Sequence, residues 1–182
     1  MILVLVGSPL SGKTTILKKL NEKNIKVFSA DVFVNNIYKK GELGYEIIRK
    51  ELGNDFVGES KVNKRKLAEW CSENSDNINK LNSLIHPLIY NYLEDKDNYV
   101  AELPIVSNSH IKFKYDKLVY VKASDEVIRN RFISKKIENP IFINKIINDW
   151  KKIDIKFDLV IDTTENITNN DIDKILSLLN NE

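Results

Sequence analysis

A phosphate-binding motif lies close to the start of this chain of 182 residues. Gly7 is followed by four residues and then by Gly12, Lys13 and Thr14, which matches the pattern G-x-x-x-x-G-K-[ST]. The two glycines permit backbone angles at which successive N–H groups turn inward around anionic oxygens. An apolar run leads into the motif and a helical pattern leads out, so the helix dipole adds positive charge at the same place. This arrangement predicts a loop that binds the phosphates of a nucleotide.

The residue types in the loop specify a nucleoside triphosphate with magnesium. Lys13 supplies a point charge for the outer phosphates, and Thr14 offers a hydroxyl ligand for Mg²⁺. The alternative is a glycine turn with a solvated lysine, which the complete motif in this context disfavours. We therefore expect ATP and Mg²⁺ as cofactors. The residues expected to bind ATP are Gly7, Leu10, Ser11, Gly12, Lys13, Thr14 and Thr15.

Two acidic residues at the ends of apolar runs are candidates for the chemistry. Asp31 follows the second run, which we expect to form a strand next to the phosphate loop. Because ligands bind outside the carboxyl ends of such strands, Asp31 could accept the proton of an attacking hydroxyl or hold Mg²⁺ through water. Glu102 is placed like a Walker-B acid and could orient water bound to Mg²⁺. The structural alternatives are a helix N-cap for Asp31 and a strand-edge cap for Glu102.

A basic segment over residues 129–136 offers the positive charge that phosphoryl transfer requires. We expect Arg131 to contact phosphate during catalysis, because a planar guanidinium matches phosphate oxygens better than an ammonium does. For Lys135 and Lys136, a solvated helix face is the better explanation.

Five short apolar runs are predicted to form the sheet that positions these residues. They cover residues 1–6, 25–30, 98–105, 117–123 and 157–162. Most of the runs are continuous rather than alternating, which is typical of strands covered on both faces in a parallel sheet. Helical patterns lie between them. The sequence therefore predicts an α/β fold of the P-loop NTPase type, with a parallel five-stranded sheet flanked by helices.

The spacing of the runs predicts two helical outgrowths from this core. About seventy residues separate the second run from the third, far more than one crossover helix needs. We expect a single kinase chain with a core of residues 1–30, 98–125 and 153–182, a helical substrate-binding insertion over 31–97, and a helical lid over 126–152.

Composition narrows the class of partner and the compartment. The formal net charge of +2 is too small to argue for nucleic acid, and no apolar run reaches the length of a membrane span, about 18 to 20 residues. The first six residues lack the basic leader and cleavage site of a signal peptide. Cys71, the only cysteine, excludes an internal disulfide and suits a reducing cytoplasm. We expect a cytoplasmic protein without nucleic-acid or membrane partners, and the oligomeric state stays open.

Motif content favours a small kinase over other nucleotide-binding classes. GTP switches carry the motifs N-K-x-D and D-x-x-G. The segment "NDWKKID" (148–154) lacks the residue order of N-K-x-D and also lacks the strand that precedes that motif. Large motor ATPases need a longer chain.

Several segments of this sequence resemble motifs of the dephospho-CoA kinase family, and the resemblance extends over nearly the whole chain. The most specific match is "LNSLIHPLIYNYL" (81–93), which carries the family's Leu-x-x-x-x-His-Pro element with His86. "SADVF" is similar to an Asp-Ala-Asp segment, with Asp31 at the acid assigned as base. Arg65 falls on the arginine of the family's Arg-x-x-Leu helix, Arg131 on the lid arginine, and Pro104 on the proline of a Pro-Leu-Leu strand. The resemblance implies ATP-dependent phosphorylation of the 3′-hydroxyl of dephospho-CoA, the last step of coenzyme A biosynthesis.

Some positions depart from the family's pattern, and some keep a structural alternative. From the residues alone, Arg65 could belong to an exposed helix start, and His86 before Pro87 could be a structural residue where the helix bends. The implied acceptor contacts are Asp31, Arg65 and His86. The departures are Val6, Leu10, Ser29, Asn108, Trp150 and the adjacent Lys151 and Lys152, which stand where the family has other groups.

Two other functions fit the same motifs. A kinase for a nucleoside or a nucleoside monophosphate would share the core and the lid. A nucleotide-binding regulator with weak catalysis would keep the loop and tolerate the altered lid.

Overall fold

The computed structural model describes residues 1–103, 114–153 and 155–180 and divides the chain into two compact units. The first, here called the core unit, comprises Met1–Ser29 and Lys96–Glu182. The second, the helical unit, comprises Ala30–Asp95. Pro104, Asn108 and the end of the third apolar run lie outside the described residues.

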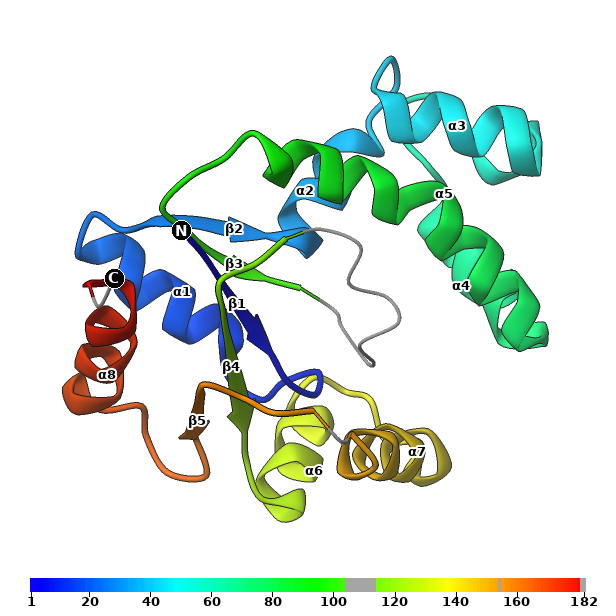
Figure 1. Ribbon diagram of the computed structural model, residues 1–182. Coiled ribbons are helices and arrows are strands. Elements are labelled where there is room, and N and C mark those ends of the chain that lie inside the picture. The colour runs from blue at the N-terminus through cyan, green and yellow to red at the C-terminus, as the bar shows by residue number, and fades with distance from the viewer. Residues whose placement is uncertain (104–113, 154, 181–182) are drawn as a thin grey trace. The chain divides into compact units, whose positions relative to one another are not determined.

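The core unit contains a five-stranded parallel sheet with the order β2-β3-β1-β4-β5 (Figure 1). The strands are β1 (Ile2–Val6), β2 (Lys26–Ser29), β3 (Tyr99–Glu102), β4 (Lys117–Lys122) and β5 (Leu159–Asp162). Every residue of β1 is buried, as expected for a central strand covered on both faces. The predicted fold class and the parallel sheet are confirmed.

The position predicted for the second strand is wrong. β2 does not lie next to β1, because β3 pairs with both of them in parallel. Glu102 is opposite Leu5 of β1 on one side and opposite Ser29 of β2 on the other. The long connection after β2 gives the chain enough length to return between two strands that are consecutive in sequence. The acidic residue on the strand beside the phosphate loop is therefore Glu102.

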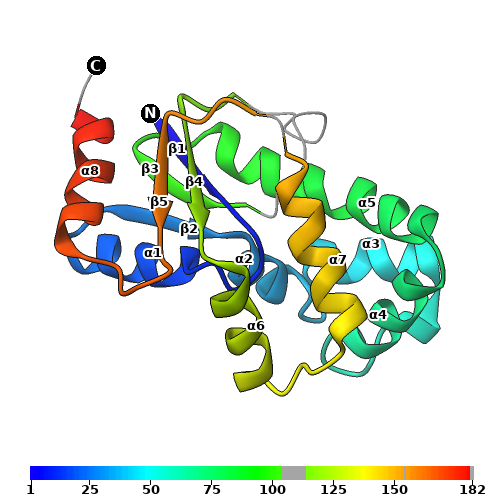
Figure 2. The same ribbon diagram turned by 90° about the horizontal axis from the view of Figure 1, so that it is seen from below.

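Four helices complete the described core unit. They are α1 (Lys13–Glu22), α6 (Asp125–Ser134), α7 (Pro140–Lys151) and α8 (Asn169–Asn180). Ile16 and Leu20 of α1 share one buried cluster with Ile172 and Ile175 of α8 and with residues of the sheet. A second cluster joins α6 to α7. Figure 2 shows α1 and α8 away from α6 and α7, and α6 begins just after the carboxyl end of β4.

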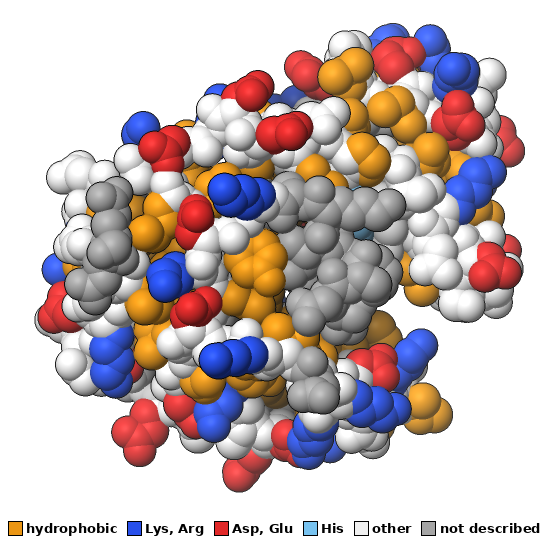
Figure 3. Space-filling model, viewed as in Figure 1, with side chains coloured by type: hydrophobic (Ala, Val, Ile, Leu, Met, Phe, Trp, Pro, Cys, Tyr) orange, Lys and Arg blue, Asp and Glu red, His pale blue; other side chains and the backbone are white. Residues whose placement is uncertain are grey.

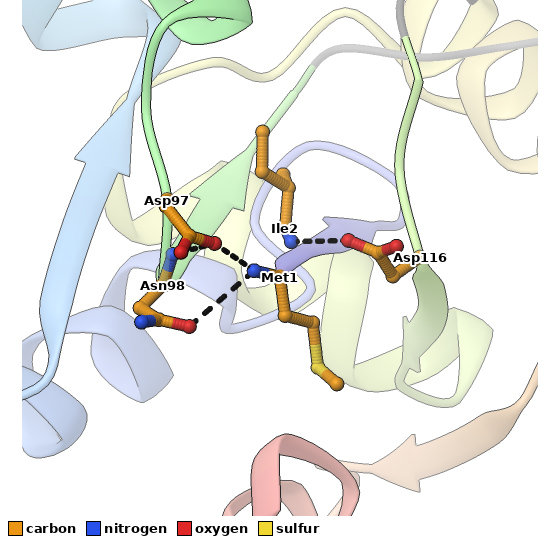
Figure 4. A network of polar contacts seen from close by, with 5 residues as sticks. All are labelled: Met1, Ile2, Asp97, Asn98 and Asp116. Carbon is orange, nitrogen blue, oxygen red and sulfur yellow. Dashed lines mark hydrogen bonds and ion pairs between the residues drawn. The ribbon is translucent and has the colours of Figure 1, made fainter. Parts of the chain in front are cut away.

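Polar contacts fix the amino ends of the strands (Figure 4). The ammonium of Met1 pairs with the carboxylate of Asp97, and this contact is the main reason that the pKa of Asp97 lies below its ordinary value. The N–H of Ile2 donates to Oδ2 of Asp116 at 2.7 Å. These acids pair with main-chain nitrogen groups at the amino ends of the strands, and the phosphate loop follows the carboxyl end of β1. We therefore assign their charges to stabilising the fold.

The helical unit consists of four α-helices and one 3₁₀ turn. They are α2 (Ala30–Ile37), α3 (Leu43–Leu52), η1 (Asn54–Phe56), α4 (Lys64–Glu73) and α5 (Ser75–Glu94). α5 is a continuous helix with Pro87 inside it, and Ile85, Ile89 and Leu93 bury one face at four-residue steps. Among the described helices, none combines the length and the apolar character that a membrane crossing requires.

Charges of both signs are interspersed on the face of the molecule drawn in Figure 3, in line with the small net charge of the sequence. The expectation of no nucleic-acid partner stays a prediction.

We predict a specific loss of stability at alkaline pH from Tyr38 in the helical unit. Its side chain is buried, and burial, with a smaller contribution from Cys71, raises the pKa of the hydroxyl from 10.0 to about 12. The unfolded chain loses this proton near pH 10, whereas the folded chain keeps it until about pH 12. The contribution to stability is therefore complete below pH 10 and is lost progressively above it.

The test compares urea unfolding of the parent protein and Tyr38→Phe from about pH 8 to about pH 11.5. The parent should lose about 2 kcal/mol more than the variant over this range. Tyr92→Phe, which removes a more exposed phenol of the same unit, is the matched control and should follow the parent. Parallel curves for Tyr38→Phe and the parent would contradict the prediction.

Candidate active site

The phosphate loop joins β1 to α1, and both of its glycines are required by their surroundings. A Cβ on Gly7 would lie 2.1 Å from the carbonyl oxygen of Val121, which no rearrangement of a side chain could relieve. Gly12 has φ of 102°, in the left-handed region, and a Cβ there would press on Thr163 at 3.3 Å. The loop is thus packed closely against the residues at the ends of β4 and β5.

Leu10 takes up a backbone conformation that ordinarily favours glycine. Its φ is 63°, which costs a residue with a side chain about 1 kcal/mol. The side chain is half-buried and packs against the apolar cluster of α6 and α7. The carbonyl oxygen of Leu10 accepts a hydrogen bond from Nη1 of Arg131 at 2.9 Å. Contacts on the side chain and on the backbone therefore oppose the strain.

Lys13 and Ser11 present polar groups to the interior of the loop. Lys13 is only 7% exposed, and its Nζ donates to the carbonyl oxygens of Gly7 and Ser8 at 2.8 and 2.9 Å. The hydroxyl of Ser11 is buried and has no hydrogen-bond partner among the described residues. A buried ammonium held at the loop carbonyls and an unsatisfied hydroxyl fit a site that an anion completes.

Thr14 and Glu102 form the part of the site suited to a metal ion. The hydroxyl of Thr14 donates to Oε2 of Glu102 at 3.2 Å, and Glu102 is buried at the carboxyl end of β3. Hard oxygen ligands of this kind suit Mg²⁺, which keeps several waters and takes the rest of its ligands from phosphates. Among the described residues, no group of three or more His, Cys, Asp or Glu side chains is placed to hold a metal ion. The donor set therefore fits Mg²⁺.

Arg131 lies on α6 and contacts the loop rather than solvent alone. Its Nη2 donates to the carbonyl oxygen of Thr163 at 2.7 Å, and its Nη1 donates to Oγ1 of Thr163 at 3.2 Å as well as to Leu10. The basic residue predicted for the lid is thus close to the phosphate loop.

Thr163 is a functional candidate that the sequence analysis missed. Its side chain is fully buried, and its hydroxyl donates to the carbonyl oxygen of Ser11 at 2.5 Å. The residue follows β5 directly, so the position of a hydroxyl residue at the carboxyl end of a predicted strand was the available signal. Next to it, hydrogen bonds from Thr164 hold the pKa of Asp162 below its ordinary value, with Lys122 adding to the effect. These contacts fix the turn that supports the loop.

The end of α7 carries residues that depart from the family's pattern. Trp150 is buried and stacks on Tyr120, which in turn stacks on Phe157 with ring centroids 4.8 Å apart. The ammonium of Lys151 pairs with Asp125, the first residue of α6, at 2.5 Å. Both residues therefore connect α7 to the rest of the core unit.

Three other candidate residues belong to the helical unit. Asp31 is exposed in the first turn of α2, two residues after the end of β2. It is the second residue of that helix, so the N-cap alternative becomes a first-turn acid that still interacts favourably with the helix dipole. Arg65 is 87% exposed and its Nε lies 3.5 Å from Glu69, one helical turn away. His86 is half-buried, with Nδ1 3.5 Å from the hydroxyl of Tyr90.

Comparison with known proteins adds a family to this geometry. A family model described as dephospho-CoA kinase matches residues 1–169. A dephospho-CoA kinase of Fusobacterium nucleatum is 33% identical over 178 residues, which cover 92% of this chain and 91% of the relative.

Solved structures share the fold at lower identity. TT1252 of Thermus thermophilus has a TM-score of 0.69 at 15% identity, over 98% of this chain and 95% of that one. A shikimate kinase of Aquifex aeolicus has a TM-score of 0.60 at 18% identity, over 99% and 96% of the two chains. Because a shikimate kinase has the same fold, the choice of acceptor depends on the sequence matches.

Proposed function

The chain belongs to the dephospho-CoA kinase family, whose activity is the ATP-dependent phosphorylation of dephospho-CoA in coenzyme A biosynthesis, and we propose how its own residues carry this out. The acceptor is the 3′-hydroxyl of dephospho-CoA, and the product is coenzyme A. The observation that carries the proposal is the family match over residues 1–169, which include the phosphate loop, Asp31 and Arg131.

The phosphate loop binds ATP, the phosphoryl donor of the reaction. Lys13 turns its ammonium from the loop carbonyls to the outer phosphates of ATP, while backbone N–H groups of the loop hold the remaining oxygens. Arg131 adds charge near the loop. Because the transition state of phosphoryl transfer is loose, positioning and charge stabilisation supply most of the catalysis.

Thr14 and Glu102 are the residues that hold Mg²⁺ in this proposal. The hydroxyl of Thr14 would be a direct ligand of the ion, and the carboxylate of Glu102 would orient a water bound to it. Asp31 is a second candidate for a contact through water. When bound, the ion neutralises charge on the β- and γ-phosphates.

Asp31, Arg65 and His86 are assigned to the acceptor. Asp31 orients the 3′-hydroxyl and takes its proton, while Arg65 and His86 bind other parts of dephospho-CoA. A cytoplasmic location is proposed with the activity and rests on the single Cys71.

The decisive experiment offers the purified protein a panel of acceptors with ATP. We expect coenzyme A to form from dephospho-CoA in equal amount to ADP, with activity lost in EDTA and restored by Mg²⁺. Nucleosides, nucleoside monophosphates and shikimate should give no product. Transfer to one of these acceptors alone would overturn the proposal, and ATP binding without transfer to any acceptor would favour a regulator.

A further inference from the structure

Leu10 of the phosphate loop packs against the apolar cluster that α6 and α7 share. Its side chain is half-buried. The buried members of that cluster are Ile128, Phe132, Ile143 and Ile147.

The same residue is held a second time through its backbone. Arg131 of α6 donates to its carbonyl oxygen at 2.9 Å, and the guanidinium also donates to the carbonyl oxygen of Thr163 at 2.7 Å. Thr163 in turn donates to the carbonyl oxygen of Ser11 at 2.5 Å. The carbonyl groups of Leu10 and Ser11, which are neighbours in the loop, thus both accept hydrogen bonds from residues outside the loop.

The backbone of Leu10 is in the left-handed region, which is unfavourable for a residue with a side chain. With φ of 63°, the position has a conformation in which glycine would be free of strain. Compared with glycine, a leucine there does not stabilise the local backbone, so we attribute its stabilising contribution to the contact with the α6–α7 cluster.

We propose that Leu10 is a positioning residue that couples the phosphate loop to the α6–α7 pair, so that ATP in the loop and the placement of these helices depend on each other. The inference rests on the proposed function for the identity of the ligand. Coupling between binding and conformation is reciprocal. Loss of the Leu10 side chain should therefore weaken ATP binding, and ATP binding should then no longer change the placement of α7.

Trp150 provides a direct measurement of this coupling, because it lies near the end of α7 and stacks on Tyr120 of β4. Trp70→Phe leaves Trp150 as the single tryptophan. In that background we expect ATP to change the emission of Trp150. Leu10→Gly should abolish the change and raise the KM for ATP about fivefold to tenfold, the lower part of the usual range for coupled sites. Its kcat should fall by a smaller factor. Leu10→Met, which keeps an apolar side chain of similar volume, should restore most of both effects.

Controls separate this coupling from simple packing and from the proposed function. Ile141→Ala removes a side chain of α7 that is 81% exposed and should behave as the parent does. A lowered melting temperature in Leu10→Gly with unchanged KM and an intact Trp150 response would overturn the proposal, as would a parent that binds ATP without any change at Trp150. A parent that does not bind ATP at all would instead overturn the proposed function.

Discussion

Replacement of Lys13 by alanine is expected to lower kcat/KM for ATP by about 10² to 10³, the loss typical of removing one preorganised group that stabilises transition-state charge. Lys13 is buried against the loop carbonyls of Gly7 and Ser8, so its charge is already in the loop before ATP binds. No other lysine or arginine lies within the motif itself. Turnover and ATP affinity should fall together, measured by steady-state kinetics and calorimetry.

Two further variants show whether the charge or the hydrogen bonds of Lys13 matter. Lys13→Gln can still donate to a loop carbonyl but lacks the charge, and we expect it to be as defective as alanine. Lys18→Ala removes an exposed lysine of the same helix and should leave kinetics unchanged. Recovery of activity in Lys13→Gln would mean that Lys13 supports the loop and does not act on phosphate.

The elements of the core unit could be predicted from the sequence because their signals are local. Continuous apolar runs mark the strands, and in the helical unit four-residue spacing marks the buried face of α5 in the same way. The order of the strands could not be predicted from such patterns. β3 pairs with both β1 and β2, although about seventy residues separate β2 from β3 in the sequence. A local pattern of residues does not predict pairing over such a distance. The neighbour of the loop strand was therefore misidentified.

The candidate site divides in the same manner. Lys13, Thr14 and the two glycines are within one short motif, so their chemistry can be read directly. The contact of Arg131 with Leu10 joins residues 121 positions apart, and its contact with Thr163 spans 32. Such contacts depend on the packing of α6 against the loop, which a residue type alone does not encode.

Asp31→Asn tests the acceptor side, and we expect turnover to fall by about 10² with little change in KM for ATP. The hydroxyl proton leaves late in a loose transition state, so removal of the base should cost the lower end of the range of about 10² to 10⁴ known for general acid–base groups. The substituted amide would keep the size of the side chain and one acceptor oxygen, so the change removes the charge and the basicity. The measurement is single-turnover formation of coenzyme A.

The alternative role of Asp31, a first-turn acid that stabilises α2, predicts a different pattern. Asp76 occupies the first turn of α5 in the same unit and is also exposed, so Asp76→Asn loses a similar interaction with a helix dipole. Both variants should unfold at slightly lower denaturant concentration, and only Asp31→Asn should lose turnover. Equal turnover in the two variants would remove Asp31 from the chemistry and leave it a structural residue of its helix.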